Sequence, residues 1–356
     1  MAQGDSFRSG WASLLGVREE ATLGTFVTVA AGGYLPFNSH SMKLSREKMP
    51  VESLNGTRDF MMVVQGGEKV EGSIEFYANA ADDTVIRLLK HALAGSVTSA
   101  SVAGAGATCI QHTLYAGDGQ NNGNTASASN TPGLSIYAKY GETLTAAVGY
   151  AGCRVNSFSI KGELGQPIVM TAELVGMTGS ITTLTHPTAT FSSQIPLMFN
   201  NVSVIKADNI GSITSGTTIK VQSFELTINN NIQSDDAAGA LGSRGPTVLP
   251  MGRREISLKL SARFDTTTTW DEYITAGDTI SALRINIDSG VTAGAIAGAT
   301  TYGMYFDLPF MKWVNPTPEV SGAEILTQEL EAKVYASLTV TNYAIRAVVY
   351  NLTANY

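Results

Sequence analysis

Charged residues are scarce in this 356-residue chain, where Asp, Glu, Lys and Arg together make up 15% of the sequence. An ordinary soluble domain has about 25%. Hydrophobic residues make up 44%, so the chain can bury a sizeable core and is not intrinsically disordered. A monomer of this size would carry more Lys and Glu on its surface. The deficit therefore predicts that other subunits cover much of the uncharged polar surface.

Cysteine and histidine are also rare. With only Cys109 and Cys153 there is no disulfide framework, and both are expected to be reduced thiols of a protein made in the cytoplasm. The four histidines share no metal-ligand spacing with one another or with the cysteines. Cys109 and His112 lie three residues apart in a predicted strand, so their side chains point to opposite faces. We therefore predict no catalytic, metal-binding or cofactor-binding residues, and no enzyme.

Three further absences limit the possible partners. The chain has no run of 18 or more apolar residues, which excludes a transmembrane helix. Its N-terminus lacks the basic start and apolar core of a signal peptide. Its 23 basic residues against 30 acidic residues give a net charge of −7, and no basic stripe is present to hold nucleic acid by its phosphates. Membrane contact and specific nucleic-acid binding are not expected.

The sequence is rich in Gly, Ser, Thr and Asn, which favours strands and turns. Alternating residues predict a strand at 41–45, and a polar stretch then leads to a second strand at 70–77. A short helix follows over 82–95, with acids in its first turn and Gly95 as its stop. Its inward residues recur at helical spacing and include Val85, Leu88 and Leu89. Strands at 155–161 and 168–175 complete this set.

The same order of elements recurs about 180 residues later. Strands are predicted at 221–228 and 255–262, separated by a polar loop. A capping box at 269–272 opens a second short helix, which ends at Gly277. The residues of this helix expected to face inward are Trp270, Tyr273 and Ile274. The set closes with strands at 304–312 and 324–335, and 344–350 is one more strand.

We interpret this order as a duplication. The fold class is mainly β with one short helix per repeat. Residues 1–190 form the first domain, with an N-terminal arm and a Gly/Asn-rich insertion near 117–133, and residues 191–356 form the second. The alternative is that two unrelated β domains resemble each other because alternating strands are common.

At these residues the chain resembles a bacteriophage tail tube protein of the kind in which the tube domain is duplicated. The similarity is carried by four pieces of sequence: 16–25, Gly56-Thr57-Arg58 leading to 70–74, the helix with Leu88 and Leu89, and 226–231. It spans nearly the whole chain and depends on the combination and order of these pieces.

The resemblance implies two tandem β-sandwich domains whose inner sheets join edge to edge into a closed barrel. Single-domain relatives form hexameric rings, so a chain with two copies would form a homotrimer with pseudo-six-fold symmetry. Stacked rings would make a tube that conducts DNA during ejection without binding it specifically. The expected place is the phage tail of the virion, after assembly in the host cytoplasm. Other expected partners are the tape measure, terminator and baseplate proteins, and a sheath if the tail contracts.

The family's rings stack through the long loop between the first two strands, which corresponds here to 45–59 and 230–251. The charged residues expected to mediate this stacking are Arg46, Lys48, Glu52, Arg58, Asp235, Asp236 and Arg244. Two alternatives stay open at this point. One is a tail connector, terminator or baseplate ring that does not polymerise. The other is a glycan-binding β-sandwich, which would need exposed aromatics and paired carboxylates in one cleft.

Overall fold

The computed structural model describes most of the chain. The described residues are 10–51, 59, 62–95, 97–102, 109–117, 133–141, 147–182, 188–192, 195–234, 238–264, 273–274, 280–293, 301–314, 318, 326–336 and 343–353. They form antiparallel strands, the helix α1 (Asp83–Leu93), two α-helical residues at Tyr273 and Ile274, and three short 3-10 segments, η1 (Gly10–Ala12), η2 (Phe199–Asn201) and η3 (Ile210–Ser215). The expected mainly β fold is confirmed.

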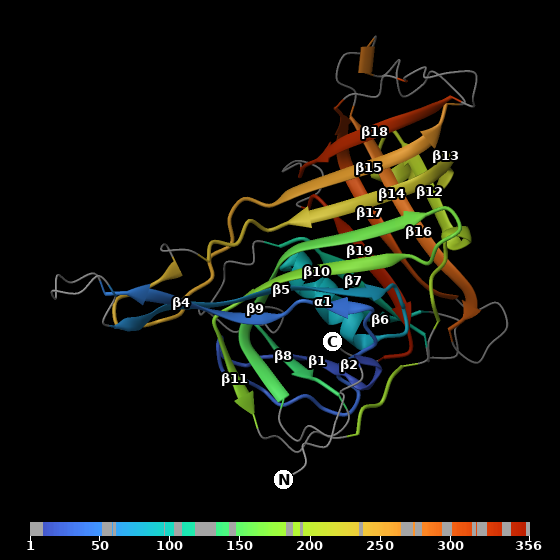
Figure 1. The fold of residues 1–356 in the computed structure, drawn as a ribbon. Helices are drawn as coiled ribbons and strands as arrows, with labels where there is room; N and C mark the ends of the chain where they lie inside the picture. The colour runs from blue at the N-terminus through green and yellow to red at the C-terminus, as the bar shows by residue number, and fades with distance from the viewer. Residues whose placement is uncertain are drawn as a thin grey trace.

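One layer of the fold, here called the front sheet, crosses the middle of Figure 1. Its strands, in spatial order, are β4 (Lys43–Pro50), β5 (Val63–Tyr77), β10 (Val169–Gly176), β9 (Ala147–Glu163), β14 (Val221–Asn229), β15 (Glu255–Arg263) and β18 (Thr327–Val334). The C-terminal end of β17 (Thr301–Trp313) pairs with the far side of β18. The short β3 (Ser39–His40) pairs with the same edge of β5 as β4 does, nearer the C-terminal end of β5.

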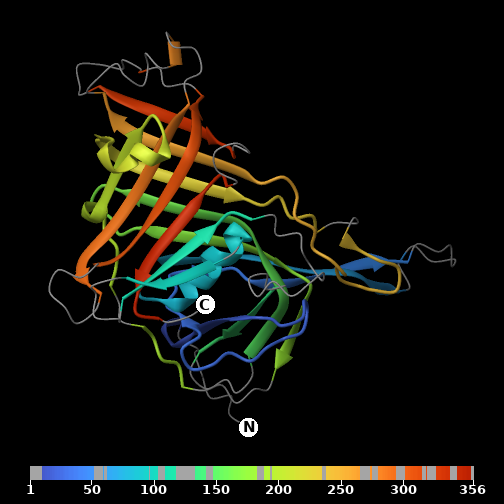
Figure 2. The same cartoon turned by 180° about the vertical axis from the view of Figure 1, so that it is seen from behind.

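Two further groups of strands complete the fold: the larger lies behind the front sheet, and the smaller lies below it in Figure 1 and in Figure 2, near the N-terminus. The larger has the order β6 (Val97–Ser101), β7 (Ile110–Tyr115), β19 (Arg346–Asn351), β17, β16 (Ser281–Thr292), β12 (Val202–Ala207) and β13 (Thr217–Ile219). The smaller has the order β2 (Tyr34–Leu35), β1 (Leu14–Glu19), β8 (Leu134–Lys139), β9 and β11 (Thr178–Thr182). Strands β9 and β17 are long enough to belong to both layers.

The change of layer along β9 is fixed at Gly152. This residue has φ +68°, and a Cβ at this position would lie 2.7 Å from the Met177 sulfur, so only glycine fits. The buried Glu20 carboxylate holds the bend, because it accepts hydrogen bonds from the Gly152 N–H at 2.8 Å and the Ser135 hydroxyl at 2.9 Å. A buried acid therefore sets the direction in which the long strand leaves the front sheet.

The helix α1 (Asp83–Leu93) forms within the segment predicted from the sequence; it lies between the layers and packs on β9. Asp82 caps its N-terminus by accepting the Thr84 N–H at 2.8 Å. The left-handed residue at its end is Ala94, with φ 50°, and not the expected Gly95. Gly95 is needed for another reason, because its Cβ would lie 1.7 Å from the Tyr115 carbonyl oxygen.

The two halves of the sequence are joined closely. Strand β9 pairs with β14, and β7 pairs with β19 across the same division. Asn230 and Arg254 from the second half donate hydrogen bonds to the Ala92 and Leu93 carbonyls at the end of α1, at 2.9 and 3.0 Å. One continuous hydrophobic core contains buried residues of both halves. The division at residue 190 stays a prediction, but the halves share a sheet, a core and a helix cap.

Two sequence expectations need correction. The segment from Ser45 to Asp59 was expected to be a loop, whereas β4 continues to Pro50 and β5 begins at Val63 instead of Val70. The inward-facing helix expected at 269–277 lies outside the described residues except for Tyr273 and Ile274. These two side chains are 42% and 58% exposed, so in the single chain they do not pack inward. Among the described helices, none is both long and apolar enough to cross a membrane.

Candidate functional site: a polar sheet face and a projecting arm

The outer face of the front sheet is polar along its whole width. On each strand, buried apolar residues alternate with solvent-facing polar ones, as in Phe224, Leu226 and Ile228 of β14 against Glu225 and Thr227. The same alternation runs through β10, β15 and β18. Because the period of two places all inward side chains in the core, the outer face is left to Ser, Thr, Lys and Glu. The sequence pattern predicted this alternation for the second half.

One row of charges across the outer face of the front sheet alternates in sign. Lys161, Glu225, Lys259 and Glu331 are directly paired across four neighbouring strands, from β9 to β18. Lys161 also lies 2.7 Å from Glu163, and this hydrogen bond raises the pKa of the lysine. Opposite charges that face each other across strands stabilise the sheet and neutralise one another. The row therefore presents no uncompensated cation.

The whole outer face has nearly balanced charge. Its basic side chains number seven and its acidic side chains eight on the described strands, which gives −1. The basic set is Lys43, Lys69, Lys161, Lys259, Arg263, Lys312 and Lys333, and the acidic set is Glu71, Glu75, Glu163, Glu173, Glu225, Glu255, Glu329 and Glu331. Lys312 and Lys333 lie directly opposite each other across β17 and β18, but the acidic side chains outnumber the basic ones over the face as a whole. A surface that grips phosphates needs an excess of adjacent cations, which this face as a whole does not have.

Beyond the edge of the sheet, β4 and the first residues of β5 project as an arm (Figure 1). Its base is held by cross-strand ion pairs, Lys43 with Glu71 at 3.3 Å and Arg46 with Glu68 at 3.0 Å. Lys69 also lies 2.9 Å from Glu71, and the hydrogen bond that it donates lowers the pKa of this carboxyl. The arm is therefore a twisted hairpin with paired charges along its base.

The outer part of the arm is apolar and exposed. Its exposed apolar side chains, here called the arm tip, are Met49 (44% exposed), Val51 (39%), Met62 (59%), Val63 (57%) and Val64 (38%). A soluble monomer rarely leaves such a group of apolar side chains together in water. The residues Met61-Met62-Val63-Val64 stand out as an apolar run in the sequence, but sequence reasoning assigned the segment to no element.

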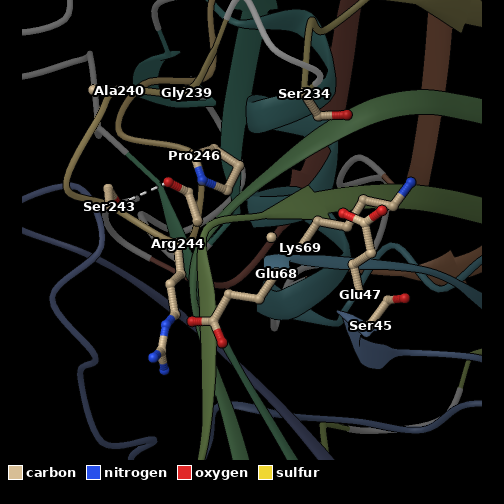
Figure 3. A pocket seen from close by; sticks show the side chains of 12 residues that line it. Ser45, Glu47, Glu68, Lys69, Ser234, Gly239, Ala240, Ser243, Arg244 and Pro246 are labelled. Atoms are coloured by element: carbon tan, nitrogen blue, oxygen red, sulfur yellow. Dashed lines mark hydrogen bonds between the residues drawn. The ribbon is translucent and has the colours of Figure 1, made fainter. Parts of the chain in front are cut away.

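The second predicted stacking loop lies against the base of this arm. The Glu68 N–H donates to the Arg244 carbonyl at 2.8 Å, and the Ser243 hydroxyl donates to the Gly245 carbonyl at 2.8 Å. Between the two segments is an open groove of about 520 Å³, lined by Glu47, Lys69 and the 239–246 loop among others (Figure 3). The two segments that the repeat pattern pairs in sequence are thus neighbours in space.

The predicted stacking residues are only partly placed. Arg46 and Lys48 lie on β4, exposed, and Arg244 lies on the second loop, with its guanidinium 3.5 Å from the Gln65 amide oxygen. Glu52, Arg58, Asp235 and Asp236 lie outside the described residues. Of the helix residues, Val85, Leu88 and Leu89 are at most 1% exposed and pack in the core. Trp270 lies outside the described residues.

The histidines and cysteines of the described residues do not form a reactive group. Cys109 and Cys153 are both buried, and burial raises the pKa of each thiol, which disfavours the reactive thiolate. His112 is buried between the Ser99 hydroxyl at 2.8 Å and the Asn351 side chain at 2.9 Å. Among the described residues, no three His, Cys, Asp or Glu side chains are grouped as metal ligands would be.

The densest charge cluster lies in the second layer. Asp307 on β17 is fully buried and accepts two hydrogen bonds from Arg284, at 2.6 and 3.0 Å, and others from Arg346. Arg284 also lies 4.2 Å above the centre of the Tyr305 ring. Because one carboxylate meets two guanidinium groups, the cluster joins β16, β17 and β19, and its role is structural.

Comparison with known proteins identifies one family. A family model described as "Phage tail tube protein" matches residues 10–334. No curated protein matches the chain. The match includes both halves of the front sheet, the arm and the helix α1.

Proposed function

The chain belongs to the phage tail tube protein family, and from this premise we propose that three copies close into a ring and that stacked rings form the conduit for phage DNA. The family is a structural one and not a family of enzymes. As a tube protein the chain is a component of the virion tail. Assembly in the host cytoplasm and contacts with tape measure, terminator and baseplate proteins are parts of the same proposal.

One observation carries the proposal: the front sheet contains the same four-strand unit twice. The first unit has the order β4, β5, β10, β9, and the second has the order β14, β15, β18, β17. If the four strands of each unit are numbered in sequence order, their spatial order across the sheet is first, second, fourth, third in both units. The units are joined by β9 and β14, so each chain contributes two equivalent segments to one continuous sheet.

The same kind of junction can join neighbouring chains. Within the described residues, the outer edge of β4 has no strand partner, and at the C-terminal end of β17 the residues after Met311, Lys312 and Trp313, are in register with β18 but not with β16. These two edges correspond to β14 and β9, which pair with each other inside the chain. Pairing β17 of one copy with the β4 edge of the next would close the sheet and remove its open edges. Three copies give six units, the pseudo-six-fold ring implied by the family.

The polar outer face of the front sheet would line the lumen of such a ring. Lys and Glu alternate in the row from β9 to β18, and the face as a whole carries −1, so little counterion release would favour attachment of DNA. A slightly acidic wall of Ser and Thr suits a conduit through which a polyanion must slide. The apolar face of the sheet is buried in the subunit's own core and cannot serve this purpose.

Electron microscopy of the purified protein tests the proposal. We expect rings with three-fold symmetry and two similar lobes per subunit, together with stacked tubes at high concentration. Many tens of copies per virion are expected for a tube, whereas a connector or terminator ring would be present in a handful. Compact monomers under all conditions, including mixtures with other tail proteins, would contradict the proposal.

A further inference from the structure

We propose that rings stack head to tail, with the apolar arm tip of one copy inserted into an apolar cavity at the opposite end of β5 in a copy of the next ring. The inference builds on the proposed tube function and names the surface that receives the arm. Its partner is a second copy of this chain.

The receiving cavity has a volume of about 170 Å³. Its apolar wall is formed by Leu35, Pro36, Phe37, Tyr77, Val85 and Pro196. Small-molecule pockets start at roughly 300 Å³, so this cavity is sized for one or two side chains. Tyr77 at its mouth is 49% exposed. The arm tip supplies the side chains of the required kind, Met and Val.

The placement of the two surfaces gives the stacking its direction. Strand β5 starts at Val63, in the arm tip, and ends at Tyr77, in the cavity wall. A strand of 15 residues spans about 46 Å between its ends. The arm tip and the cavity that receives it therefore lie at opposite ends of one strand. When each copy contacts the next through two different surfaces at its opposite ends, the contact can repeat in one direction without forming a closed ring. The growth of a tube requires this.

Polar groups on the two surfaces are also complementary. Asp82 lies in the cavity wall, and its Oδ2 is buried without a hydrogen-bond partner among the described residues. On the arm, Lys48 is exposed beside Met49 of the arm tip. A buried carboxylate oxygen without a donor is unfavourable, so a lysine or main-chain N–H brought by the arm would improve the contact.

Photo-crosslinking tests the docking directly. The full chain with p-benzoylphenylalanine in place of Val63 is assembled, irradiated and digested, and the crosslinked peptides are identified by mass spectrometry. We expect crosslinks to peptides that contain Phe37, Tyr77 or Pro196 of another copy, at least tenfold more often than to any other region. The control carries the same group at Ile181, which is 78% exposed on β11 and outside the arm. Equal crosslinking from the control to these peptides would overturn the proposal.

A charge substitution gives an independent measurement. Val63→Asp is expected to shorten tubes at least tenfold and to leave single rings intact, while Val291→Asp, at an exposed valine outside the arm, leaves tube length unchanged. Adding Tyr77→Lys to Val63→Asp should restore longer tubes, because each contact then pairs an acid with a lysine. Circular dichroism checks that the variants fold.

The outcomes separate the two proposals. If wild-type tubes form but the crosslinks from position 63 map away from the cavity, the docking surface is wrong and the tube function stands. If the wild-type protein forms neither rings nor tubes, the tube function fails and the docking inference fails with it.

Discussion

At the scale of single residues, the ion pair between Glu19 and Lys90 shows how scarce charges are used inside this fold. The Lys90 ammonium lies 3.0 Å from the Glu19 carboxylate, and the His91 imidazole nitrogen lies 3.5 Å from the same oxygen. Burial alone would raise the pKa of Glu19, but the hydrogen bonds and charges of these partners lower it to about 2. The three side chains fasten β1 to the helix α1.

Removing Lys90 should destabilise the subunit strongly. Lys90→Met leaves the largely buried Glu19 carboxylate without its cation, and we expect a loss of about 3 kcal/mol in unfolding free energy. The measurement is urea denaturation followed by circular dichroism at neutral pH. The double variant Lys90→Met with Glu19→Gln should recover part of this loss, because the stranded charge is gone. A double variant less stable than Lys90→Met would show that the pair does not act as described.

The same residues predict the acid sensitivity of the fold. Burial lowers the pKa of His91 below its ordinary 6.5, so the stability that the neutral ring contributes is present above pH 6.5 and is lost as the pH falls further. The contribution of Glu19 is complete above pH 4.5 and is lost between pH 4.5 and about 2. Urea midpoints measured from pH 7 to pH 3 should decline in two stages. Glu19→Gln should flatten the lower stage and move the upper one to lower pH, because the Glu19 carboxylate raises the pKa of His91 against the effect of burial.

Sequence reasoning recognised little of this at the residue scale. Neither Glu19 nor the Glu20 carboxylate that fixes the β9 bend had any signal, because their partners lie far away in the sequence. Acidic residues next to each other near a strand end are normally solvent-exposed. Only the contacts made in the folded chain distinguish Glu19 and Glu20 from ordinary surface acids.

At the scale of elements, Gly95 is the position where the backbone is packed most closely. Because a Cβ would lie 1.7 Å from the Tyr115 carbonyl oxygen, Gly95→Ala must push the end of α1 away from β7. We expect a loss of roughly 2–3 kcal/mol, typical of an overpacked site, measured by thermal or urea unfolding. Gly10→Ala is the control, since nothing lies within 4 Å of its Cβ. Equal stability of the two variants would contradict the close contact.

Arg254 connects the two halves of the sequence, and replacing it tests how much this connection contributes to stability. Its guanidinium donates to the Leu93 and Gly117 carbonyls and to the Asn230 side chain, so it completes the C-terminus of α1 from the other half of the sequence. Arg254→Met should cost about 2 kcal/mol, since carbonyls are left without donors. The neighbouring Arg253 is exposed, and Arg253→Met should change the unfolding free energy very little. A similar loss in both variants would mean that the joint does not depend on Arg254.

Elements with local signals were predicted well from the sequence, and elements fixed by distant contacts were not. The alternating residues of β14 and β15 and the helical spacing of Val85, Leu88 and Leu89 gave the strands and α1 nearly to their ends. The outer part of the arm was mistaken for a loop, because residues 46–50 and 63–69 include no buried side chain to produce alternation. Its strands are held by cross-strand pairing and by the hydrogen bond from the Glu68 N–H to the Arg244 carbonyl.

At the scale of the whole molecule, the front sheet contains two four-strand units with the same strand order, as a duplication would require. The order of predicted strands along the chain was sufficient to suggest the repeat, and the duplication itself stays a prediction. What the sequence could not indicate is that β7 from the first half would pair with β19 from the second. Pairing over more than 200 residues leaves no local pattern.

The balanced charge of the outer face of the front sheet yields the last prediction. Replacing Glu173, Glu225 and Glu331 by Lys changes this face from −1 to +5 and leaves uncompensated lysines on three strands. If the face lines the lumen, tubes made from this variant should retain DNA, and the variant phage should eject its genome more slowly. Retention should weaken steeply as salt is raised, because each phosphate contact releases counterions.

The control for this charge reversal is matched in size and sign. Lysines placed at Asp288, Asp208, Thr217 and Thr218, exposed residues on and beside β12, β13 and β16 that lie off the outer face of the front sheet and outside the arm, change the net charge by the same amount. DNA retention by electrophoretic mobility shift and ejection rates by fluorescence compare the two sets. Because both variants have the same net charge, only the position of the lysines distinguishes them. Equal retention by both would assign the lumen to a different face, whereas retention by the first set alone would place the front sheet around the DNA.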